Sequence, residues 1–427
     1  MLYVKRKNII NSFYYISKNS IVDYSKQQYM DKLQENFLKL LENIPLNFKR
    51  YLVDNIDWKQ RMIVILGARG TGKTTMLLQR IKENYPVTTP LEVLYVSLDN
   101  IWFGSHSLVE LADEFSKYRG KHLFLDEVHK YPGWSRELKN IYDTYPQLKI
   151  VFTGSSLLEL YQGESDLSRR VALYELAGMS FREYLNMTGN NIATCSLADI
   201  INNHLEVATQ LNKEIEFPLS RFQEYVRKGY YPFFIDAGEM YWHQLAQIIN
   251  VVLENDIPAV HDMEYASLLK IKKLLNILST STPFKPNITK LSELVGVSRN
   301  YMVELIHILG RAHLLNNLTA RGKSLGRLAK PEKIYLHNTN LYFALGENPD
   351  TGSMRETFFL NQLSVGHKVN DAEKGDFIVD EQYTFEVGGK SKDSRQIKDL
   401  AQAFIAADGI EYGIGNKIPL WLFGFLY

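Results

Sequence analysis

The stretch from Gly67 to Thr74 constrains the fold of this chain more than any other feature. Its sequence, GARGTGKT, follows an apolar run at 62–66 and precedes Thr75 and a segment of helical character. A strand, a glycine-rich loop and a helix in this order are the context of a phosphate-binding P-loop. Glycines let the backbone N–H groups turn inward around a triphosphate at the helix N-terminus. The stretch therefore predicts ATP binding.

Within this loop the residue types match the separate tasks of nucleotide binding and catalysis. Lys73 would reach the β- and γ-phosphates, and the Thr74 hydroxyl would bind Mg²⁺. The expected nucleotide contacts are Gly67, Gly70, Thr71, Gly72, Lys73, Thr74 and Thr75. ATP and Mg²⁺ are thus the expected cofactors.

The whole chain sets broad limits on what surrounds this loop. Its 427 residues are enough for two or three domains, and its formal charge of +1 gives no general reason to expect a polyanionic partner. The single cysteine, Cys195, excludes an internal disulfide and suits a reducing compartment. No signal-peptide core is present, and the longest apolar run, 418–427, is too short to span a bilayer. We expect a cytoplasmic protein without a membrane partner, and a buried last strand at 418–427.

From residue 62 onward, apolar strand-like runs alternate with helical segments. Such alternation predicts an α/β fold with a parallel sheet and helices on both faces. The expected strands are 62–66, 94–98, 123–125, 150–153 and 171–176. Residues 1–60 have helical spacing and are expected to pack on this nucleotide domain.

The second half of a nucleotide site is predicted at the end of the run HLFLDE. Asp126 would hold Mg²⁺ through water, and Glu127 would act as the base that orients the attacking water. Acidic pairs after apolar strands are common, but one that follows a P-loop by about fifty residues is a strong signal.

Two further polar positions are candidate catalytic residues. Ser155 lies at the end of the run VFTGSS, where a hydroxyl could sit between the γ-phosphate and the water; an ordinary Gly-Ser turn is an equal alternative. Arg169 could supply positive charge to the phosphate during hydrolysis. If Arg169 acts on a second copy, the protein must form a homo-oligomer.

The run from Leu125 to Arg136 (LDEVHKYPGWSR) resembles the signature of AAA-type ATPases fused to a DUF4143 domain, a family of bacteria and archaea. Three later stretches are similar to the same family: 153–156 (TGSS), 166–170 (DLSRR) and 176–185 (LAGMSFREYL). The resemblance implies a P-loop fold akin to the archaeal-type, STAND-related ATPases, then a winged helix and a nuclease-like C-terminal domain. The expected regions are an N-terminal helical region (1–60), the P-loop ATPase domain (61–200), a helical region (201–280), a winged-helix-like domain (281–335) and a restriction-endonuclease-like DUF4143 domain (336–427).

A helix-turn-helix is predicted between Leu291 and Leu305. Gly296 would make the turn and Ser298 would cap the second helix. The basic stretch Arg321–Arg327 could form a wing against DNA phosphates. Winged helices also serve as packing modules, and the second helix has few basic residues, so DNA contact and interdomain packing both stay open.

The C-terminal stretch carries residue types of the metal site in PD-(D/E)xK nucleases. Glu356, Asp376 and Glu386 would hold Mg²⁺, and a lysine would activate water. The sequence departs from that pattern because Gly388 occupies the lysine position, and the nearest candidate is Lys390. The resemblance therefore implies the fold more strongly than it implies cleavage.

Three classes of function compete. The first is an ATPase whose nucleotide state regulates a nuclease-like or DNA-contacting module. The second is a regulatory ATP switch with an inactive C-terminal domain that binds protein or nucleic acid. A DNA-translocating motor is disfavoured, because the sequence shows neither a second nucleotide fold nor much basic surface.

Overall fold

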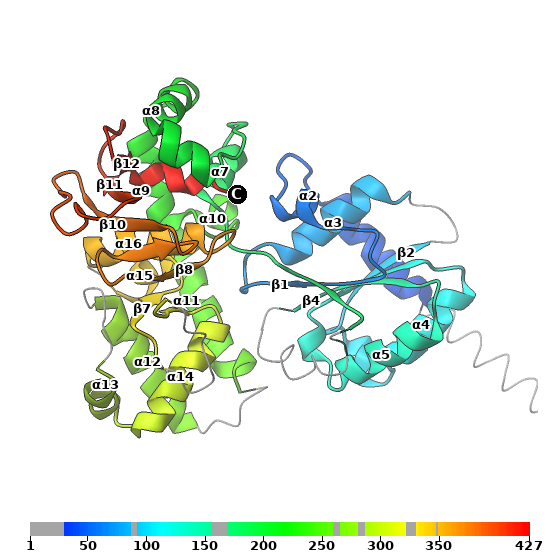
Figure 1. Cartoon of the computed structure of the whole chain (residues 1–427). Coiled ribbons are helices and arrows are strands. Elements are labelled where there is room, and N and C mark those ends of the chain that lie inside the picture. The colour runs from blue at the N-terminus through cyan, green and yellow to red at the C-terminus, as the bar shows by residue number, and fades with distance from the viewer. Residues whose placement is uncertain are drawn as a thin grey trace, which may run out of the picture.

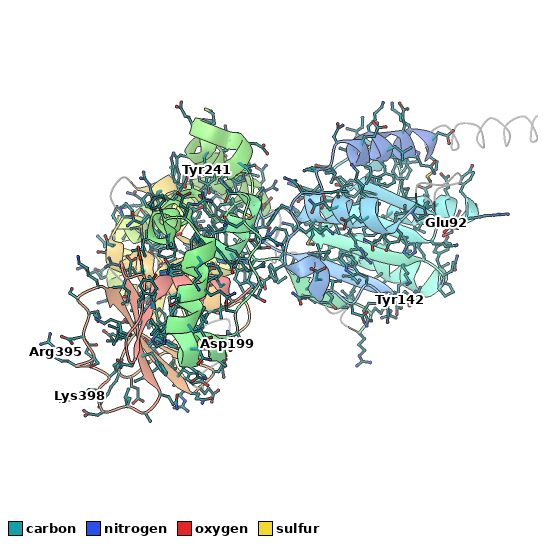
Figure 2. The ribbon with its side chains drawn as sticks, turned by 90° about the horizontal axis from the view of Figure 1, so that it is seen from above. Glu92, Tyr142, Asp199, Tyr241, Arg395 and Lys398 are labelled. Carbon is teal, nitrogen blue, oxygen red and sulfur yellow. The ribbon has the colours of Figure 1, made fainter. Side chains whose placement is uncertain are left out.

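The computed structural model describes residues 30–86, 92–154, 167, 169–258, 265–280, 287–321, 330–346 and 349–427. These residues form two lobes (Figure 1). Seen from above, Glu92 and Tyr142 belong to the first lobe, and Tyr241, Asp199 and Arg395 belong to the second (Figure 2). The two lobes contact each other through a narrow region, and the P-loop lies in this region.

The first lobe is a five-stranded parallel sheet with the order β2-β3-β4-β1-β5. Its strands are β1 (Met62–Leu66), β2 (Val93–Ser97), β3 (His122–Asp126), β4 (Lys149–Gly154) and β5 (Ala172–Glu175). Every residue of β1 is buried, as expected for a parallel strand covered on both faces. The predicted α/β fold with a parallel sheet is confirmed.

Helices lie on both faces of this sheet, with α2 and α3 on one side and α4 and α5 on the other (Figure 1). Their bounds are α2 (Leu52–Asn55), α3 (Lys73–Asn84), α4 (Leu108–Lys117) and α5 (Trp134–Thr144). The start of α4 is set by a capping box, in which Ser107 and Glu110 bond each other's backbone N–H. Residues 30–42 form a further helix, whose Leu33 and Phe37 are buried in the core of this lobe.

The second lobe begins with helices and single helical turns. They are α7 (Phe181–Met187), α8 (Leu197–Glu214), α9 (Pro218–Lys228), α10 (Phe234–Ala237), α11 (Tyr241–Val251), the π-helical turn η4 (Val252–Asp256), α12 (Tyr265–Thr280), α13 (Ile288–Val295) and α14 (Arg299–Arg311). Later helices are α15 (Thr339–Leu345) and α16 (Thr351–Leu363).

The predicted helix-turn-helix region holds α13, a turn and α14. Gly296 makes the turn with φ of 78°, and the Ser298 side chain accepts from the Tyr301 N–H at the start of α14. Strands β6 (Leu315–Leu318) and β7 (Lys333–Leu336) then pair antiparallel. Residues 322–329, which hold most of the predicted basic wing, lie outside the described residues, so a winged-helix function stays a prediction.

A mixed five-stranded sheet completes the second lobe. Its order is β12-β11-β10-β9-β8, with β10 parallel to β11 and antiparallel to β9. The strands are β8 (Val369–Asp371), β9 (Phe377–Val379), β10 (Tyr383–Gly389), β11 (Ala403–Asp408) and β12 (Lys417–Pro419). The prediction of a last strand over 418–427 was wrong in form: the strand ends at Pro419, and a buried 3-10 helix, η5 (Leu420–Phe425), follows it.

The hydrophobic clusters show how the chain is shared between lobes. The first-lobe cluster ends at Leu176. Helices α7, α8 and α9 pack with α16 and the C-terminal sheet, whereas most of the buried apolar residues between Tyr230 and Tyr342 form a separate cluster. The chain therefore largely leaves this core after α9 and returns to it at α16. Among the described residues, no helix combines the length and apolar composition that crossing a lipid bilayer requires.

Candidate functional site

The P-loop connects β1 directly to α3 and turns on glycines. Gly70 and Gly72 have φ of 84° and 92°, in the left-handed region that favours glycine. A Cβ atom at Gly67 would overlap the carbonyl oxygen of Leu176, so close backbone approach also requires glycine there. Because α3 begins at Lys73, its free N–H groups face the loop, which is the geometry of an anion site.

Lys73 is buried and folded back onto this loop. Its Nζ donates to the carbonyl oxygens of Gly67 (2.8 Å) and Ala68 (2.9 Å). Burial lowers the pKa of Lys73, and the charges of Glu127 and Asp126 oppose that shift. When a phosphate binds, Lys73 would therefore exchange its two carbonyl partners for a charged phosphate oxygen, which is a stronger hydrogen-bond acceptor.

Asp126 ends β3 and is surrounded by hydroxyl groups. Thr74 Oγ1 donates to its Oδ2 at 2.5 Å, Tyr95 donates to the same oxygen at 2.7 Å, and Thr153 donates to Oδ1. The Thr74 hydroxyl and the Asp126 carboxylate are thus adjacent oxygen ligands of the kind that Mg²⁺ prefers. The predicted pair converges, although the sequence did not indicate Tyr95 or Thr153.

Glu127 follows in a left-handed conformation, with φ of 54°. A non-glycine residue in this region is uncommon and often marks a functional site. Burial raises the pKa of Glu127, and the neighbouring Lys73 charge opposes the rise. The His129 ring lies beside it, with Nε2 at 3.4 Å from Glu127 Oε2, and burial lowers the pKa of His129 to about 4.

Arg50 holds the outer side of the P-loop. It donates to the backbone oxygens of Thr71 and, at 2.7 Å, Ala177, while Glu183 accepts from its Nε at 3.0 Å. Glu183 also completes the capping box of α7. The loop is therefore fixed to the segment that leads into the second lobe.

A cavity of about 430 Å³ opens at the start of α3. Segments before β1 and from the second lobe line it together with the P-loop. Its lining includes Phe48, Arg50, Gly72, Lys73, Thr74, Thr75, Glu127, Met187, Pro232 and Phe233. The segment before β1 is fixed there because Gln79 of α3 donates to two of its carbonyl oxygens, at 2.8 Å each.

Of the other two catalytic candidates, one lies outside the described residues and the other lies away from this site. Ser155 lies outside the described residues; the hydroxyl that contacts Asp126 at the end of β4 is that of Thr153. Arg169 is exposed and precedes β5, whose Ala172 pairs with Ile63 at the start of β1. Because the P-loop follows the other end of β1, Arg169 lies near the amino ends of the strands, away from the P-loop of its own chain.

The C-terminal carboxylates are in one region, but lysines lie beside two of them and a tyrosine donates to the third. Lys392 Nζ pairs with Glu386, and Lys333 Nζ lies 3.8 Å from Asp376. Tyr335 donates to Glu356 at 2.6 Å. Burial, and then the Asp376 charge, raise the pKa of Glu356 to about 7.

The lysine expected in this cluster was placed wrongly. Lys390 is exposed, and Lys392 is the residue that reaches Glu386. A Cβ atom at Gly388 would lie 2.8 Å from Lys392 Cγ, so the glycine in the expected lysine position leaves room for this side chain. In the part of the chain that the structure describes, no three His, Cys, Asp or Glu side chains form a group that could hold a metal ion.

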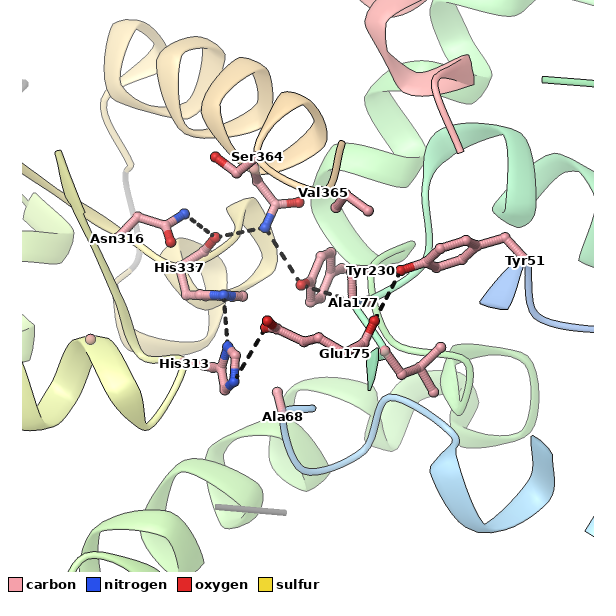
Figure 3. A pocket seen from close by; sticks show the side chains of 14 residues that line it. Tyr51, Ala68, Glu175, Ala177, Tyr230, His313, Asn316, His337, Ser364 and Val365 are labelled. Atoms are coloured by element: carbon pink, nitrogen blue, oxygen red, sulfur yellow. Dashed lines mark hydrogen bonds and ion pairs between the residues drawn. The ribbon is translucent and has the colours of Figure 1, made fainter. Parts of the chain in front are cut away.

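A second cavity, of about 270 Å³, lies between the P-loop and the second lobe (Figure 3). Ala68 of the P-loop borders it. Glu175, His313 and His337 form a chain across it: His313 Nε2 lies 3.7 Å from Glu175 Oε1, and its Nδ1 lies 3.2 Å from His337 Nε2. Burial lowers the pKa of His313 to about 4.

Comparison with known families divides the chain into two matched regions. A family model described as an AAA domain matches residues 59–185, and one described as a domain of unknown function (DUF8612) matches residues 219–351. Over residues 59–185 the first lobe is therefore similar to AAA domains, and its strand order and P-loop are those of a P-loop NTPase fold. The DUF4143 fusion that the sequence resemblance implied is not supported, since the match in the second half is to DUF8612.

Two proteins of Methanocaldococcus jannaschii are similar over most of their length. The uncharacterized protein MJ1637 is 28% identical over 436 residues, covering 91% of this chain and 92% of that protein. The uncharacterized protein MJ1544 is 22% identical over 343 residues, covering 76% and 72%. Among solved structures, the Walker-type ATPase PABY2304 of Pyrococcus abyssi is 10% identical, with a TM-score of 0.39, over 71% of this chain and 99% of that one.

Proposed function

We propose that this chain is an Mg²⁺-dependent ATPase whose nucleotide state regulates the second lobe. One observation carries the proposal: Lys73, the Thr74–Asp126 pair and Glu127 converge at the carboxyl edge of a parallel sheet. That edge, at the N-terminus of a helix, is where an α/β P-loop domain binds triphosphates.

Each group has a distinct role in this proposal. The P-loop N–H groups and Lys73 bind the β- and γ-phosphates, and Thr74 and Asp126 hold Mg²⁺, which supplies charge neutralisation on the phosphate oxygens. Glu127 orients a water toward the γ-phosphorus and accepts its proton. The water oxygen bonds to the γ-phosphorus as the bond from that phosphorus to the β–γ bridging oxygen breaks, and the products are ADP and phosphate.

The cavity at the start of α3 is the proposed place of the adenosine. It continues from Thr74 and Thr75, and its apolar wall includes Phe48 and Met187. Phe233 and Pro232 of the second lobe close its other side, so an occupant touches both lobes. This shared wall supports the regulatory part of the proposal, because a ligand shifts an arrangement only through contacts that differ between states.

Steady-state hydrolysis of ATP with and without Mg²⁺ tests the ATPase. We expect hydrolysis by the wild type, loss of it in Lys73→Ala, and wild-type rates in Lys59→Ala, whose exposed side chain is in the same lobe. X-ray scattering with a non-hydrolysable ATP analogue and with ADP then tests regulation. Identical scattering in both states, from enzyme that hydrolyses ATP, would disprove the coupling.

A nuclease activity is the second candidate. It is favoured by the location of Glu356, Asp376 and Glu386 in one region, where the Asp376 charge helps to raise the pKa of both glutamates, although in this structure the three do not form a group that could hold a metal ion. The lysine partners of Glu386 and Asp376 favour instead an inactive domain that binds protein or nucleic acid. Incubation of labelled DNA with Mg²⁺ or Mn²⁺ separates these. Cleavage that is lost in Glu386→Ala supports the nuclease; salt-dependent DNA binding without cleavage supports the binding domain, with α14 as a candidate contact.

A homo-oligomer is proposed only in connection with Arg169. This side chain is exposed at the edge away from its own P-loop, so it could act only on a second copy. Light scattering with ATP present, together with the hydrolysis rate of Arg169→Ala, tests that role. A monomer that hydrolyses ATP at the same rate with Ala at this position would contradict it.

A further inference from the structure

Asp256 is a buried carboxylate in the second lobe that faces the nucleotide site. It is the last residue of η4, and only 2% of its surface is exposed. A carboxylate so removed from water costs free energy unless cations and hydrogen bonds compensate it. Its compensating partners come from the first lobe.

Arg69 of the P-loop supplies the main compensation. Its Nε and Nη2 donate to the two oxygens of Asp256, at 3.3 and 3.1 Å, as a two-point fork. Such a fork fixes both the position and the plane of the guanidinium. The same Nη2 lies 3.8 Å from Glu127 Oε2, so the fork holds Arg69 next to the proposed base.

The segment after Glu127 adds two more contacts. Lys130 Nζ lies 3.7 Å and His129 Nε2 lies 4.0 Å from Asp256 Oδ1. Asp256 thus touches residues on both sides of the nucleotide site, the P-loop and the turn that follows β3.

Packing around the fork holds η4 in position. Ile248 of α11, the helix that leads into η4, and Phe233 pack against Gly70 of the P-loop, where a Cβ atom would lie 3.2 and 3.3 Å from their side chains. The contact between lobes is therefore formed by close packing as well as by charge. Asp256 is therefore held in position only when the second lobe packs against the P-loop.

We propose that Asp256 is a positioning residue for ATP hydrolysis, which aims Arg69 at the phosphate side of Glu127. The ATPase site of the first lobe is then complete only while the second lobe is docked. This inference depends on the proposed ATPase activity. It supplies a guanidinium from the same chain, because Arg69 already lies beside Glu127, and it does not depend on Arg169 of a second copy.

The physical reason is preorganisation of charge. Hydrolysis needs positive charge fixed where the transferred phosphoryl group develops negative charge. Without Asp256, Arg69 is free to turn fully onto Glu127 and to pair with it. Misplacement of this kind slows the chemical step, by about tenfold to a hundredfold, while ATP binding by the remaining P-loop groups changes little.

The test is steady-state kinetics of ATP hydrolysis in Asp256→Asn, Arg69→Gln and the double variant. Glu254→Gln is the matched control, since Glu254 is on the same turn and pairs with Lys272 at the surface. We expect Asp256→Asn to lower kcat at least about tenfold with KM for ATP within about threefold. The double variant should be no slower than Arg69→Gln, because Asp256 acts through Arg69. Glu254→Gln should match the wild type.

Several results would overturn the proposal. One is a wild-type kcat in Asp256→Asn; another is a double variant whose loss equals the product of the single losses. If Asp256→Asn shows no cooperative unfolding transition and is therefore not folded, Arg69→Lys serves as the test variant in its place. Lysine keeps the positive charge but cannot form the two-point contact with Asp256. A wild-type kcat in Arg69→Lys would contradict the proposal. If the wild type itself does not hydrolyse ATP, both the proposed function and this inference are rejected. If the wild type hydrolyses ATP and only the variants give the contrary results above, this inference alone is rejected.

Discussion

Arg50 and Glu183 form a buried ion pair that joins the P-loop to the beginning of the second lobe. Arg50 Nε lies 3.0 Å from Glu183 Oε1, and the two side chains are 4% and 1% exposed. Arg50 also donates to the Thr71 carbonyl oxygen inside the loop. A single guanidinium therefore sets the position of the phosphate-binding backbone relative to α7.

Glu183→Gln should destabilise the protein by about 3–5 kcal/mol, because it leaves the Arg50 charge buried without its counter-charge. The amide oxygen of glutamine can still accept from the Ser180 N–H, so the change removes the charge and leaves the α7 capping box in place. Urea unfolding at pH 7.5 measures this. Glu35→Gln is the control: Glu35 pairs with Lys39 at 64% exposure, so its loss should leave the free energy of unfolding close to that of the wild type. Equal effects of the two substitutions would refute the structural role of the buried pair.

Glu127→Gln should separate ATP binding from hydrolysis. The amide keeps the shape of the side chain but cannot accept the proton of water, so we expect kcat to fall by about 10²–10⁴. Binding of a fluorescent ATP analogue should persist, because Lys73 and the P-loop backbone are unchanged. Glu239→Gln, at an exposed position, is the control. Hydrolysis at more than a tenth of the wild-type rate would show that another group is the base.

Thr153→Val should raise the Mg²⁺ concentration needed for half-maximal ATP hydrolysis. Thr153 donates to Asp126 Oδ1 and accepts from the Glu127 N–H at 3.2 Å, so it orients both acidic residues. Loss of an outer partner of this kind weakens metal affinity about 10–100-fold. A Mg²⁺ titration of hydrolysis measures the shift, with Thr209→Val on exposed α8 as the control. An unchanged titration would mean that Thr74 and Tyr95 orient Asp126 without Thr153.

The first lobe could be predicted from the sequence because its signals are local. The run 62–66 is continuously apolar, the P-loop has its own spacing, and Asp126 ends a strand, so each feature is contained in a short stretch of chain. The parallel sheet follows from the alternation of such stretches. Thr74 and Asp126 then meet because β1 and β3 are in one parallel sheet, separated only by β4.

The partners that hold this site were not predictable, since they are distant in sequence and ordinary in type. Arg50 and Glu183 are separated by 133 residues, and Arg69 and Asp256 by 187. Nothing in their surroundings distinguishes a buried Asp256 from an exposed acidic residue. The same limit explains the error at Lys390: the choice of Lys392 depends on how the chain turns after β10 and on the space above Gly388.

Acid should destabilise this protein partly through His313. Burial lowers the pKa of His313 to about 4 in the folded state, against about 6.5 in the unfolded chain. Between these values the unfolded state binds more protons, so this group's contribution is present above pH 6.5 and is lost as the pH falls toward 4. At pH 5 the loss is about 2 kcal/mol relative to pH 7.5.

The difference between wild type and His313→Gln isolates this effect, because other groups, among them Glu175 and Lys73 nearby, titrate in both proteins. The free energy of unfolding in urea should fall less from pH 7.5 to pH 5 in His313→Gln than in the wild type. His243→Gln, in which an exposed ring is replaced, should keep the wild-type pH dependence. If the free energy of unfolding of His313→Gln falls as steeply from pH 7.5 to pH 5 as that of the wild type, then His313 is not held neutral. The chain from Glu175 to His337 would then already carry a proton in the folded protein at pH 5.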